Sequence, residues 1–190
     1  MRTVVIVALA LGLTLGRPAQ AVADNSPASK QALVLLRILS YDRYVGKRAR
    51  SQVVIGVVRD DDDPGSRRAA STMADALRSM SRGVTVAGKP VAVVEIAAGD
   101  LFRDRLRDLE VTAIYLTSGL DTELDGISEA ARAHPCLTFT DRIAYMRRGV
   151  AVALSSNERR ITISLDLVAV RAQGAQLSAE LLHVAEVVRR

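Results

Sequence analysis

The sequence has little of what disulfide-rich, aromatic-rich or fibrous proteins need. Its 190 residues include one cysteine and no tryptophan, and only 3% of them are aromatic. A single cysteine excludes an internal disulfide framework. Twelve glycines and five prolines exclude a collagen-like or low-complexity chain. Because 49% of the residues are hydrophobic, an intrinsically disordered chain is excluded as well, and we expect one globular domain with a sizeable core.

The sequence also lacks the short motifs that mark common enzyme classes. It contains no GxGxxG or P-loop for nucleotides, no GxSxG for a serine nucleophile and no HExxH for zinc. The motifs therefore name no enzyme reaction and indicate no catalytic residues, no metal site and no cofactor. A hydrolase with a scattered site stays open, because spacing along the chain does not reveal such a site.

The N-terminal residues have the pattern of an export signal. Arg2 gives a positive start, and residues 3–15 form an uncharged apolar run. A small-residue A-x-A pattern then ends at Ala21 and again at Ala23. The run is too short for a transmembrane helix, which needs about 20 apolar residues. We interpret residues 1–21 as a secretory signal peptide that is cleaved after Ala21 or Ala23, with an uncleaved N-terminal anchor as the alternative.

Export sets the expected location of the rest of the chain. Removal of residues 1–21 takes away Arg2 and Arg17, so the formal net charge falls from +5 to +3. So small a charge does not require a nucleic-acid partner, and export argues against one. No later run reaches transmembrane length without charges, so we expect a soluble exported product. Residues 22–29 are expected to form an N-terminal tether before a single domain at residues 30–190.

Strands and helices are expected to alternate over most of this domain. Ser26-Pro27 is a typical helix start, and an apolar helix should follow as far as Leu39. Short apolar runs predict strands at 52–58, 84–96, 111–117 and 136–140. Amphipathic stretches between them predict helices at 66–81, about 100–109 and from 122 onward. This alternation predicts an α/β fold with a mainly parallel sheet flanked by helices.

The C-terminal third of the chain has a different pattern. Residues 150–154 and 160–167 flank a polar turn, which predicts a β-hairpin. A closing helix is expected after an N-cap at Ser178, because apolar residues then follow at heptad-like spacing: Leu181, Val184, Ala185 and Val188. The single α/β domain should therefore end in a C-terminal β-hairpin and a closing helix.

A run of four aspartates, residues 60–63, is the best-placed candidate for a site. It follows a strand and precedes a helix, which is where open α/β sheets bind ligands. Four carboxylates could hold a hard cation, but consecutive side chains point in different directions and the spacing is not that of a calcium loop. We favour a solvated turn.

The histidines and the cysteine give weaker signals. Cys136 begins an apolar strand, where a free thiol behaves as a small hydrophobe. His134 lies beside it, but no further histidine or cysteine nearby completes a metal site, and the redox activity of Cys136 stays open. His183 is expected on the surface of the closing helix rather than as a ligand or base.

Basic residues gather in one short segment near the N-terminus. Lys47, Arg48 and Arg50 follow Tyr41 and Tyr44 closely. We expect a solvated loop here, and contact with an acidic partner or with lipid headgroups is the alternative.

The segment from Leu165 to Ala185, LDLVAVRAQGAQLSAELLHVA, resembles the C-terminal signature of the YfiR-like family. That signature is a strand ending in Ile-Asn-Leu, an alanine-rich turn with a glycine, Ser-Ser, a Leu-Leu pair and alanine. Residues 88–93, GKPVAV, resemble the family's G-(R/K)-P-V-x-V strand. Residues 137–141, LTFTD, followed by Gly149, resemble its L-T-V-S-D…G segment.

The sequence departs from this pattern at identifiable places. Asp166 stands where the family has asparagine, and Ala179 stands where it has the second serine. Residues 40–43, SYDR, replace the Trp-Pro that often closes the first helix, and the paired cysteines of some members are absent.

The resemblance covers about residues 30–188 and implies a small periplasmic α/β protein without enzymatic activity. The better-understood members bind and restrain the periplasmic sensor domain of a membrane-bound diguanylate cyclase, which lowers cyclic di-GMP and biofilm formation. The expected partner is thus the periplasmic domain of an inner-membrane diguanylate cyclase or sensor kinase. A sensor or accessory role for a histidine kinase, or a solute-binding component of a transport system, is the alternative.

Overall fold

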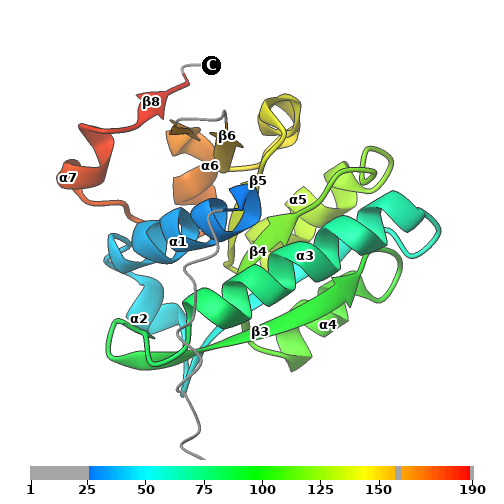
Figure 1. Cartoon of the computed structure of the whole chain (residues 1–190), viewed down its shortest axis with the longest axis horizontal. Helices are drawn as coiled ribbons and strands as arrows, with labels where there is room; N and C mark the ends of the chain where they lie inside the picture. Colours follow the sequence, from blue (N-terminus) through cyan, green and yellow to red (C-terminus); the bar gives the residue numbers. More distant parts are fainter. Residues whose placement is uncertain (1–25, 157–159, 189–190) are drawn as a thin grey trace, which may run out of the picture.

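The structure, a computed structural model, describes residues 26–156 and 160–188. In these ranges one eight-stranded sheet has the strand order β2-β3-β1-β4-β5-β6-β7-β8 and carries helices on both faces (Figure 1). The expected α/β fold with a mainly parallel sheet is confirmed. The expected signal peptide, residues 1–21, and both expected cleavage positions lie outside the described residues.

Helices and strands alternate in the first two thirds of the chain, as the sequence predicts. The elements are α1 (Pro27–Ser40), α2 (Val45–Arg48), β1 (Val53–Arg59), α3 (Pro64–Met80), β2 (Thr85–Val86), β3 (Lys89–Ala97), α4 (Phe102–Asp108), β4 (Val111–Leu116), α5 (Leu124–Ala133) and β5 (Leu137–Thr140). The remaining elements are a 3-10 helix, η1 (Ile143–Arg148), then β6 (Val152–Ser156), β7 (Ile161–Leu165), α6 (Leu167–Ala172), α7 (Ala179–Leu182) and β8 (Glu186–Val187).

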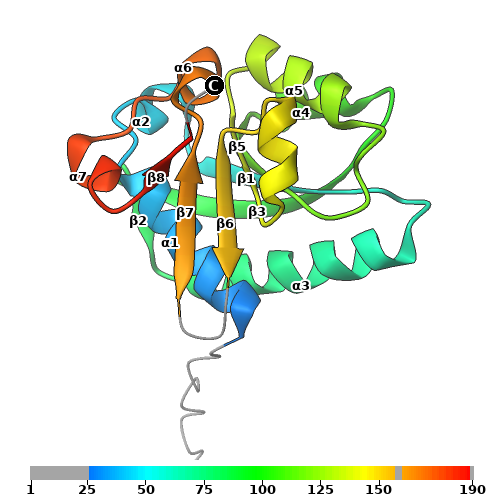
Figure 2. The same cartoon turned by 90° about the horizontal axis from the view of Figure 1, so that it is seen from above.

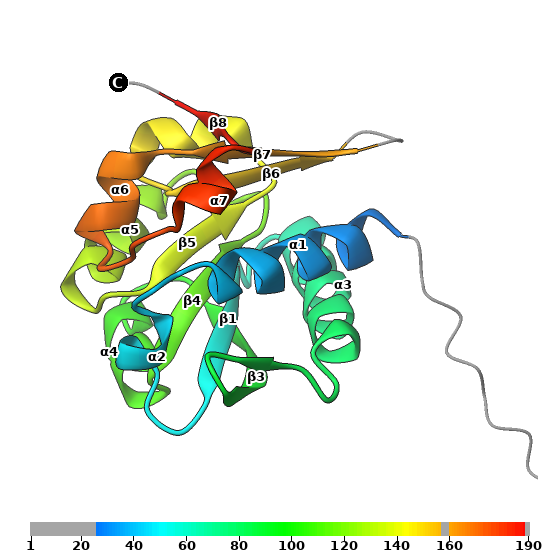
Figure 3. The same cartoon turned by 90° about the vertical axis from the view of Figure 1, so that its left-hand side faces the viewer.

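The central strands are parallel and apolar on both faces. β1 pairs in parallel with β3 on one side and with β4 on the other, and β4, β5 and β6 continue in parallel. Val53, Ile55 and Val57 of β1 belong to a core under α1 and α3, whereas Val54 and Val58 belong to a second core under α4 and α5. Figure 3 shows these two helix pairs on opposite sides of the sheet. This two-sided burial explains why the strand is a continuous β-branched run.

Helix α1 begins inside the segment that the sequence assigns to the tether at 22–29. The side chain of Ser26 accepts a hydrogen bond from the backbone N–H of Ser29, and Pro27 occupies the first turn. A capping serine and a proline with a preset φ are enough to start a helix there. Helix α1 therefore begins three residues before residue 30.

The expected β-hairpin is confirmed: β6 and β7 lie side by side (Figure 2) and follow β5 in the strand order. β6 and β7 pair antiparallel, from Val152 opposite Leu165 to Ser156 opposite Ile161. The second arm is shorter than expected because Asp166 caps helix α6 and so ends the strand.

The expected closing helix is wrong beyond its first turn. α7 ends at Leu182, and the chain then forms β8, which pairs in parallel with β7. Val184 and Val188, expected in the buried stripe, are 72% and 38% exposed. The backbone N–H of Val188 donates to the carbonyl of Leu165, so this segment adds a strand to the sheet instead of lengthening the helix. Its β-branched valines fit an extended strand better than a helix.

Substitution of Leu181 tests which side of this segment is buried. Leu181 is 2% exposed and packs in the core with α1, whereas His183 is exposed, as expected. Leu181→Ala should lower the free energy of unfolding by about 2–4 kcal/mol, because it leaves a cavity. Urea unfolding followed by circular dichroism measures this change. His183→Ala should change it by less than about 0.5 kcal/mol, and a larger loss from His183→Ala than from Leu181→Ala would reverse the assignment of faces.

Candidate functional site

The connections in the sheet change direction between β1 and β4. The chain crosses from β1 to β3 on one side and then returns to β4 on the other. In open α/β sheets, ligands bind beyond the carboxyl ends of the strands at such a point. Here hydroxyls bridge the two strand ends. Thr117 Oγ1 donates to the carbonyl of Val58 at 2.9 Å, and Ser66 Oγ lies 2.8 Å from Thr117 Oγ1 and accepts the N–H of Asp60.

The four aspartates at this point form a turn, in agreement with the favoured interpretation. The Asp63 carboxylate caps α3 by accepting the N–H of Gly65 at 2.8 Å, and the Asp60 carboxylate accepts the N–H of Asp62. Asp61 instead forms an ion pair with Arg59. Within residues 26–156 and 160–188, no three metal-ligating side chains come together. The carboxylates of Asp60, Asp61 and Asp63 therefore each make a separate local contact.

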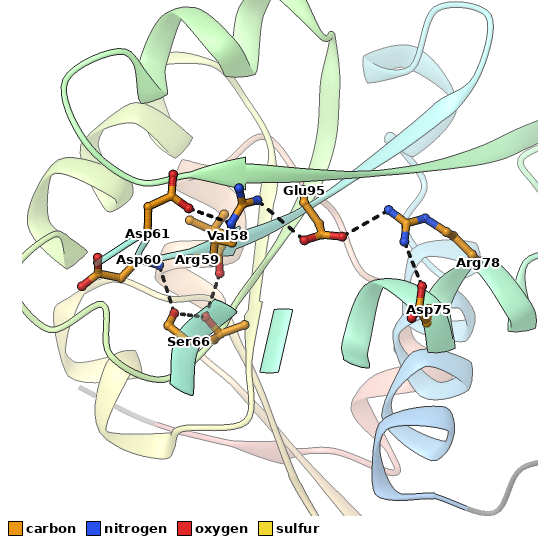
Figure 4. Close-up of polar contacts among 9 residues, drawn as sticks. Val58, Arg59, Asp60, Asp61, Ser66, Asp75, Arg78 and Glu95 are labelled. Carbon is orange, nitrogen blue, oxygen red and sulfur yellow. Dashed lines mark hydrogen bonds and ion pairs between the residues drawn. The ribbon is translucent and has the colours of Figure 1, made fainter. Parts of the chain in front are cut away.

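A chain of ion pairs runs from this turn across the sheet to α3 (Figure 4). Arg59 lies 2.8 Å from Asp61 and 3.6 Å from Glu95 of β3. Arg78 of α3 lies 3.4 Å from Glu95 and 3.0 Å from Asp75. These groups are partly exposed, so each pair contributes at most about 1 kcal/mol. The cluster pairs each of its acids with a base, which is the arrangement of a charged surface rather than of a catalytic acid and base.

A cavity of about 560 Å³ lies beyond the carboxyl ends of β4, β5 and β6, between α1 and α3. Buried Tyr115 donates its hydroxyl to Gln31 Oε1 at 3.1 Å, and Gln31 Nε2 donates to the carbonyl of Leu154. Burial raises the pKa of Tyr115 far above its usual value, and the charge of Asp141 raises it further, so the phenol stays neutral. This cavity was not predictable from the sequence, because its lining comes from separate elements: Ser26–Ala28, Gln31, Ala69, Thr72–Met73, Tyr115, Thr117–Ser118, Asp141 and Ser155–Ser156.

Arg48 departs from the solvated loop that the sequence predicts for the basic segment near the N-terminus. Arg48 and Asp42 form an ion pair of 2.6 Å with side chains 9% and 0% exposed. Arg48 Nη1 also donates to the carbonyl of Gly174, and Asp42 Oδ1 accepts the backbone N–H groups of Tyr44 and Gln176. The expectation fails at Arg48 because the backbone of residues 174–176 packs over the Asp42–Arg48 pair and encloses the guanidinium. We call the Asp42–Arg48 pair with its contacts to residues 174–176 the latch.

The other basic residues of this segment remain at the surface. Lys47 Nζ lies 4.7 Å from the centre of the Tyr44 ring, and Arg50 pairs with Glu110 at 2.7 Å. Both contacts are exposed enough to leave these two cations accessible to a partner.

Residues of the C-terminal signature hold the backbone in place. The Asp166 carboxylate caps α6 by accepting the N–H groups of Val168 and Ala169. Gln173, fully buried, accepts the N–H of Thr138 at 2.9 Å and donates to the carbonyl of Gly149 at 3.0 Å.

Glycine is required at position 174 by two features. Its φ is +71°, a conformation that favours glycine, and a Cβ there would lie 2.9 Å from the Cβ of Pro135. The same residue presents its carbonyl to Arg48 of the latch. The alanine-rich turn with its glycine therefore joins the latch to β5.

The GKPVAV segment has a similar architectural role. Ala87 and Gly88 both have positive φ, which makes the tight turn between β2 and β3. Lys89 then directs its ammonium group to the end of α2, where it donates to the carbonyls of Gly46, Ala49 and Arg50 at 2.5–2.9 Å. A lysine suits this position because the carbonyls at a helix end lack backbone donors.

Cys136 and His134 do not form a metal pair. Cys136 is fully buried, and burial raises the pKa of its thiol to about 12, so it is a poor nucleophile at neutral pH. Nε2 of His134 instead lies 3.0 Å from the carbonyl of Val111.

The sequence model of the YfiR/HmsC-like family matches residues 28–186, from the first turn of α1 to β8. The chain belongs to the YfiR/HmsC-like family. The resemblance stated from the sequence motifs is therefore confirmed, and family membership is consistent with a periplasmic regulator. No curated protein matches the chain. Of the helices in the described part, none is both long and apolar enough to cross a membrane.

Solved structures share the α/β fold. A conserved domain protein from Vibrio cholerae has a TM-score of 0.60 at 16% identity, covering 86% of this chain and 60% of its own. An ABC domain in complex with L-Trp from Streptococcus pneumonia has a TM-score of 0.58 at 8% identity, covering 83% and 60%. The ligand-free, open substrate binding protein CD0873 from Clostridium difficile has 0.53 at 11%, covering 77% and 57%. The chain thus spans 57–60% of the length of these structures.

Proposed function

We propose that this chain is a non-enzymatic periplasmic repressor that binds the sensor domain of an inner-membrane diguanylate cyclase and restrains the enzyme. The observation that carries the proposal is the family match over residues 28–186. The better-understood members act on such cyclases, and the export signal pattern at residues 1–21 would bring this chain to the same compartment. The proposal includes cleavage after Ala21 or Ala23 and a domain that is soluble once processed.

The roles of the signature residues support a binding function. Asp166, Gln173 and Gly174 stabilise the C-terminal segment through a helix cap, two buried hydrogen bonds and a constrained turn. Arg48 of the latch fixes the same segment from the other side. These contacts fix the position of the C-terminal segment, and we propose that the surface of this segment binds the partner.

Exposed valines mark the surface that we assign to the partner. Four valines of the C-terminal segment are between 38% and 72% exposed: Val168 of α6, Val184 in the turn after α7, Val187 of β8 and Val188 directly after β8. β8 is the last strand in the order of the described sheet, so its outer edge has no neighbouring strand there. Exposed apolar groups beside a free strand edge are typical of protein-binding surfaces. We propose that these four valines form one contact surface, which we call the C-terminal valine patch.

Burial of a small apolar surface can supply the binding free energy that repression requires. Shifting a sensor from mostly active to mostly inactive takes about 5.5 kcal/mol of preference for the inactive state. At about 25 cal/mol per Å², this preference equals roughly 220 Å² of apolar surface buried only in the inactive complex. A repressor can therefore act by binding alone.

The processing prediction concerns the N-terminus of the exported protein. Signal peptidase should remove the apolar run, so the protein recovered from the periplasm should begin at Val22 or Asp24. Intact-mass analysis of the periplasmic fraction measures this directly. A retained Met1 together with membrane association would contradict export by cleavage and favour the anchor.

The functional prediction concerns cyclic di-GMP. Deletion of the gene should raise cellular cyclic di-GMP and surface attachment, and expression of the exported form should reverse both. A version without residues 1–21 should fail to reverse them, because it does not reach the periplasmic sensor domain. Unchanged cyclic di-GMP in a strain that normally expresses the protein would contradict the cyclase partner, whereas a change in a histidine-kinase regulon would favour the kinase alternative.

A matched pair of variants tests the valine patch in the same assay. Val184→Asp places a charge in the patch and should abolish reversal, although the exposed position should leave folding intact. Leu101→Asp places the same charge at an exposed leucine before α4, away from the patch, and should reverse the phenotype fully. Equal behaviour of the two variants would contradict the assignment of the surface.

A second candidate function is solute binding, and the cavity between α1 and α3 favours it. Two of the proteins that share the fold are described as a domain bound to L-Trp and a substrate binding protein. Capture of membrane partners with the native protein separates the candidates. A cyclase or sensor kinase supports regulation, and a transporter permease supports solute binding.

A further inference from the structure

One side chain of the LTFTD motif is not used by the fold. Thr138 bonds with Gln173 and accepts the N–H of Ala151, and Thr140 donates to the carbonyl of Leu116. Asp141, the next residue, is exposed at the cavity between α1 and α3 and makes no hydrogen bond or ion pair within the described ranges. Its carboxylate is therefore available to a ligand.

The described residues that line this cavity carry a negative charge only. Asp141 alone among them has a formal charge, so none of these residues neutralises the carboxylate. Asp141 lines the same cavity as the buried phenol of Tyr115, and its charge contributes to the raised pKa of that phenol. Ser118 and Ser155 add hydroxyl groups that can accept a hydrogen bond from a bound cation. This electrostatic environment favours a positively charged group on the ligand.

The start of α1 does little to oppose a cation. A free helix N-terminus favours anions because its N–H groups lack partners. Here the Ser26 side chain accepts the N–H of Ser29, and Pro27 has no N–H to offer. The nearest helix end is thus largely capped.

The other side of the cavity is apolar. Pro27 and Ala28 of α1 face the cavity together with Ala69 and Met73 of α3. The volume of about 560 Å³ is in the range of small-molecule sites, about 300–1,000 Å³. An apolar wall and a carboxylate on the same cavity fit a molecule with an ammonium group at one end and a short aliphatic body.

We propose that this cavity binds a small primary amine, with the ammonium group on the Asp141 carboxylate and the aliphatic body against Ala69 and Met73. The site goes beyond the repressor function and does not depend on a cyclase partner. Its failure and the failure of repression are separate results, because binding is measured on the purified exported protein alone.

Calorimetric titration with matched probes tests the charge preference. The probes are 3-methylbutylamine, the neutral 3-methylbutanol, the anionic 4-methylpentanoate and zwitterionic L-leucine. The amine should bind at least fivefold more tightly than the alcohol, and the pentanoate should bind most weakly. Tighter binding of L-leucine than of the amine, lost in an Asp141 variant, would still support the site and identify its ligand as an amino acid. Absence of amine binding, or preference for the alcohol or the pentanoate, would overturn the proposal.

Two aspartate variants locate the binding. Asp141→Asn should remove the preference for the amine over the alcohol while leaving thermal unfolding unchanged, because the side chain supports no described contact. Asp62→Asn neutralises an exposed carboxylate outside the cavity and should keep the full preference. An Asp141→Asn protein that retains the preference would place the amine elsewhere and overturn the proposal.

Discussion

Arg48→Met should lower the free energy of unfolding by about 3–5 kcal/mol, although Arg48 lies in a short basic segment whose other cations are exposed. The substitution removes the partner of the buried Asp42 carboxylate at 2.6 Å and the donor to the Gly174 carbonyl. Removing one member of a buried ion pair is costly because an uncompensated charge stays buried. For a domain of this size the melting temperature should fall by roughly 10 °C. Urea and thermal unfolding followed by circular dichroism measure the loss.

Arg50→Met is the matched control, two residues away. The Arg50 side chain is 80% exposed and pairs with Glu110 at the surface, so its loss should cost less than about 0.5 kcal/mol. The double variant Asp42→Asn/Arg48→Met should recover part of the stability, because asparagine is neutral and its oxygen can still accept the N–H groups of Tyr44 and Gln176. Equal losses from Arg48→Met and Arg50→Met would contradict a buried latch.

Local chemistry predicted most of the parallel sheet. The strand at 53–59 is apolar throughout because it has a helical layer on each face, and that pattern is visible in the sequence. The start of α1 was predictable for a similar reason, since Ser26 caps it with its own side chain. In both cases the information lies within a few residues.

Features that depend on distant partners were not predictable in this way. The spacing of Leu181, Val184 and Val188 fits a helix, but β7 offers an unpaired edge, and the N–H of Val188 bonds there to Leu165. Arg48 looked like a solvated cation because the groups that bury it, at residues 174–176, lie more than 120 positions away. The spacing of apolar residues indicates which face of a helix each side chain would occupy. It does not indicate whether the backbone will instead pair with a strand elsewhere in the fold.

The candidate sites also differ in whether their features depend on local residues or on distant ones. The aspartate run at 60–63 was prominent in the sequence, but each carboxylate that caps or pairs does so locally. The cavity at Asp141 gave no signal, because Gln31 and Tyr115 come from elements that the fold brings together. A lone glutamine at the start of an apolar helix was the one available hint, since a buried amide needs hydrogen-bond partners.

Gln173→Leu should be about as damaging as loss of the latch, with a decrease of about 4 kcal/mol in the free energy of unfolding. Its amide is the partner of the buried Thr138 N–H and of the Gly149 carbonyl. Each group left without a partner costs about 1–3 kcal/mol, although leucine has nearly the same size as glutamine. Gln176→Leu makes the same change at an exposed side chain and should cost less than about 0.5 kcal/mol. Denaturant unfolding of both variants gives the comparison.

Gln173→Glu separates the hydrogen bonds from side-chain volume. At neutral pH a carboxylate there would be buried and could no longer donate to the Gly149 carbonyl, so the variant should be unstable. Burial should raise the folded-state pKa of the new carboxyl above its unfolded value. The protonated form is then favoured by folding, so stability relative to the parent should improve as the pH falls through the raised pKa and be lost again as it rises. A deficit independent of pH would show that packing, and not the paired amide, holds the C-terminal segment on β5.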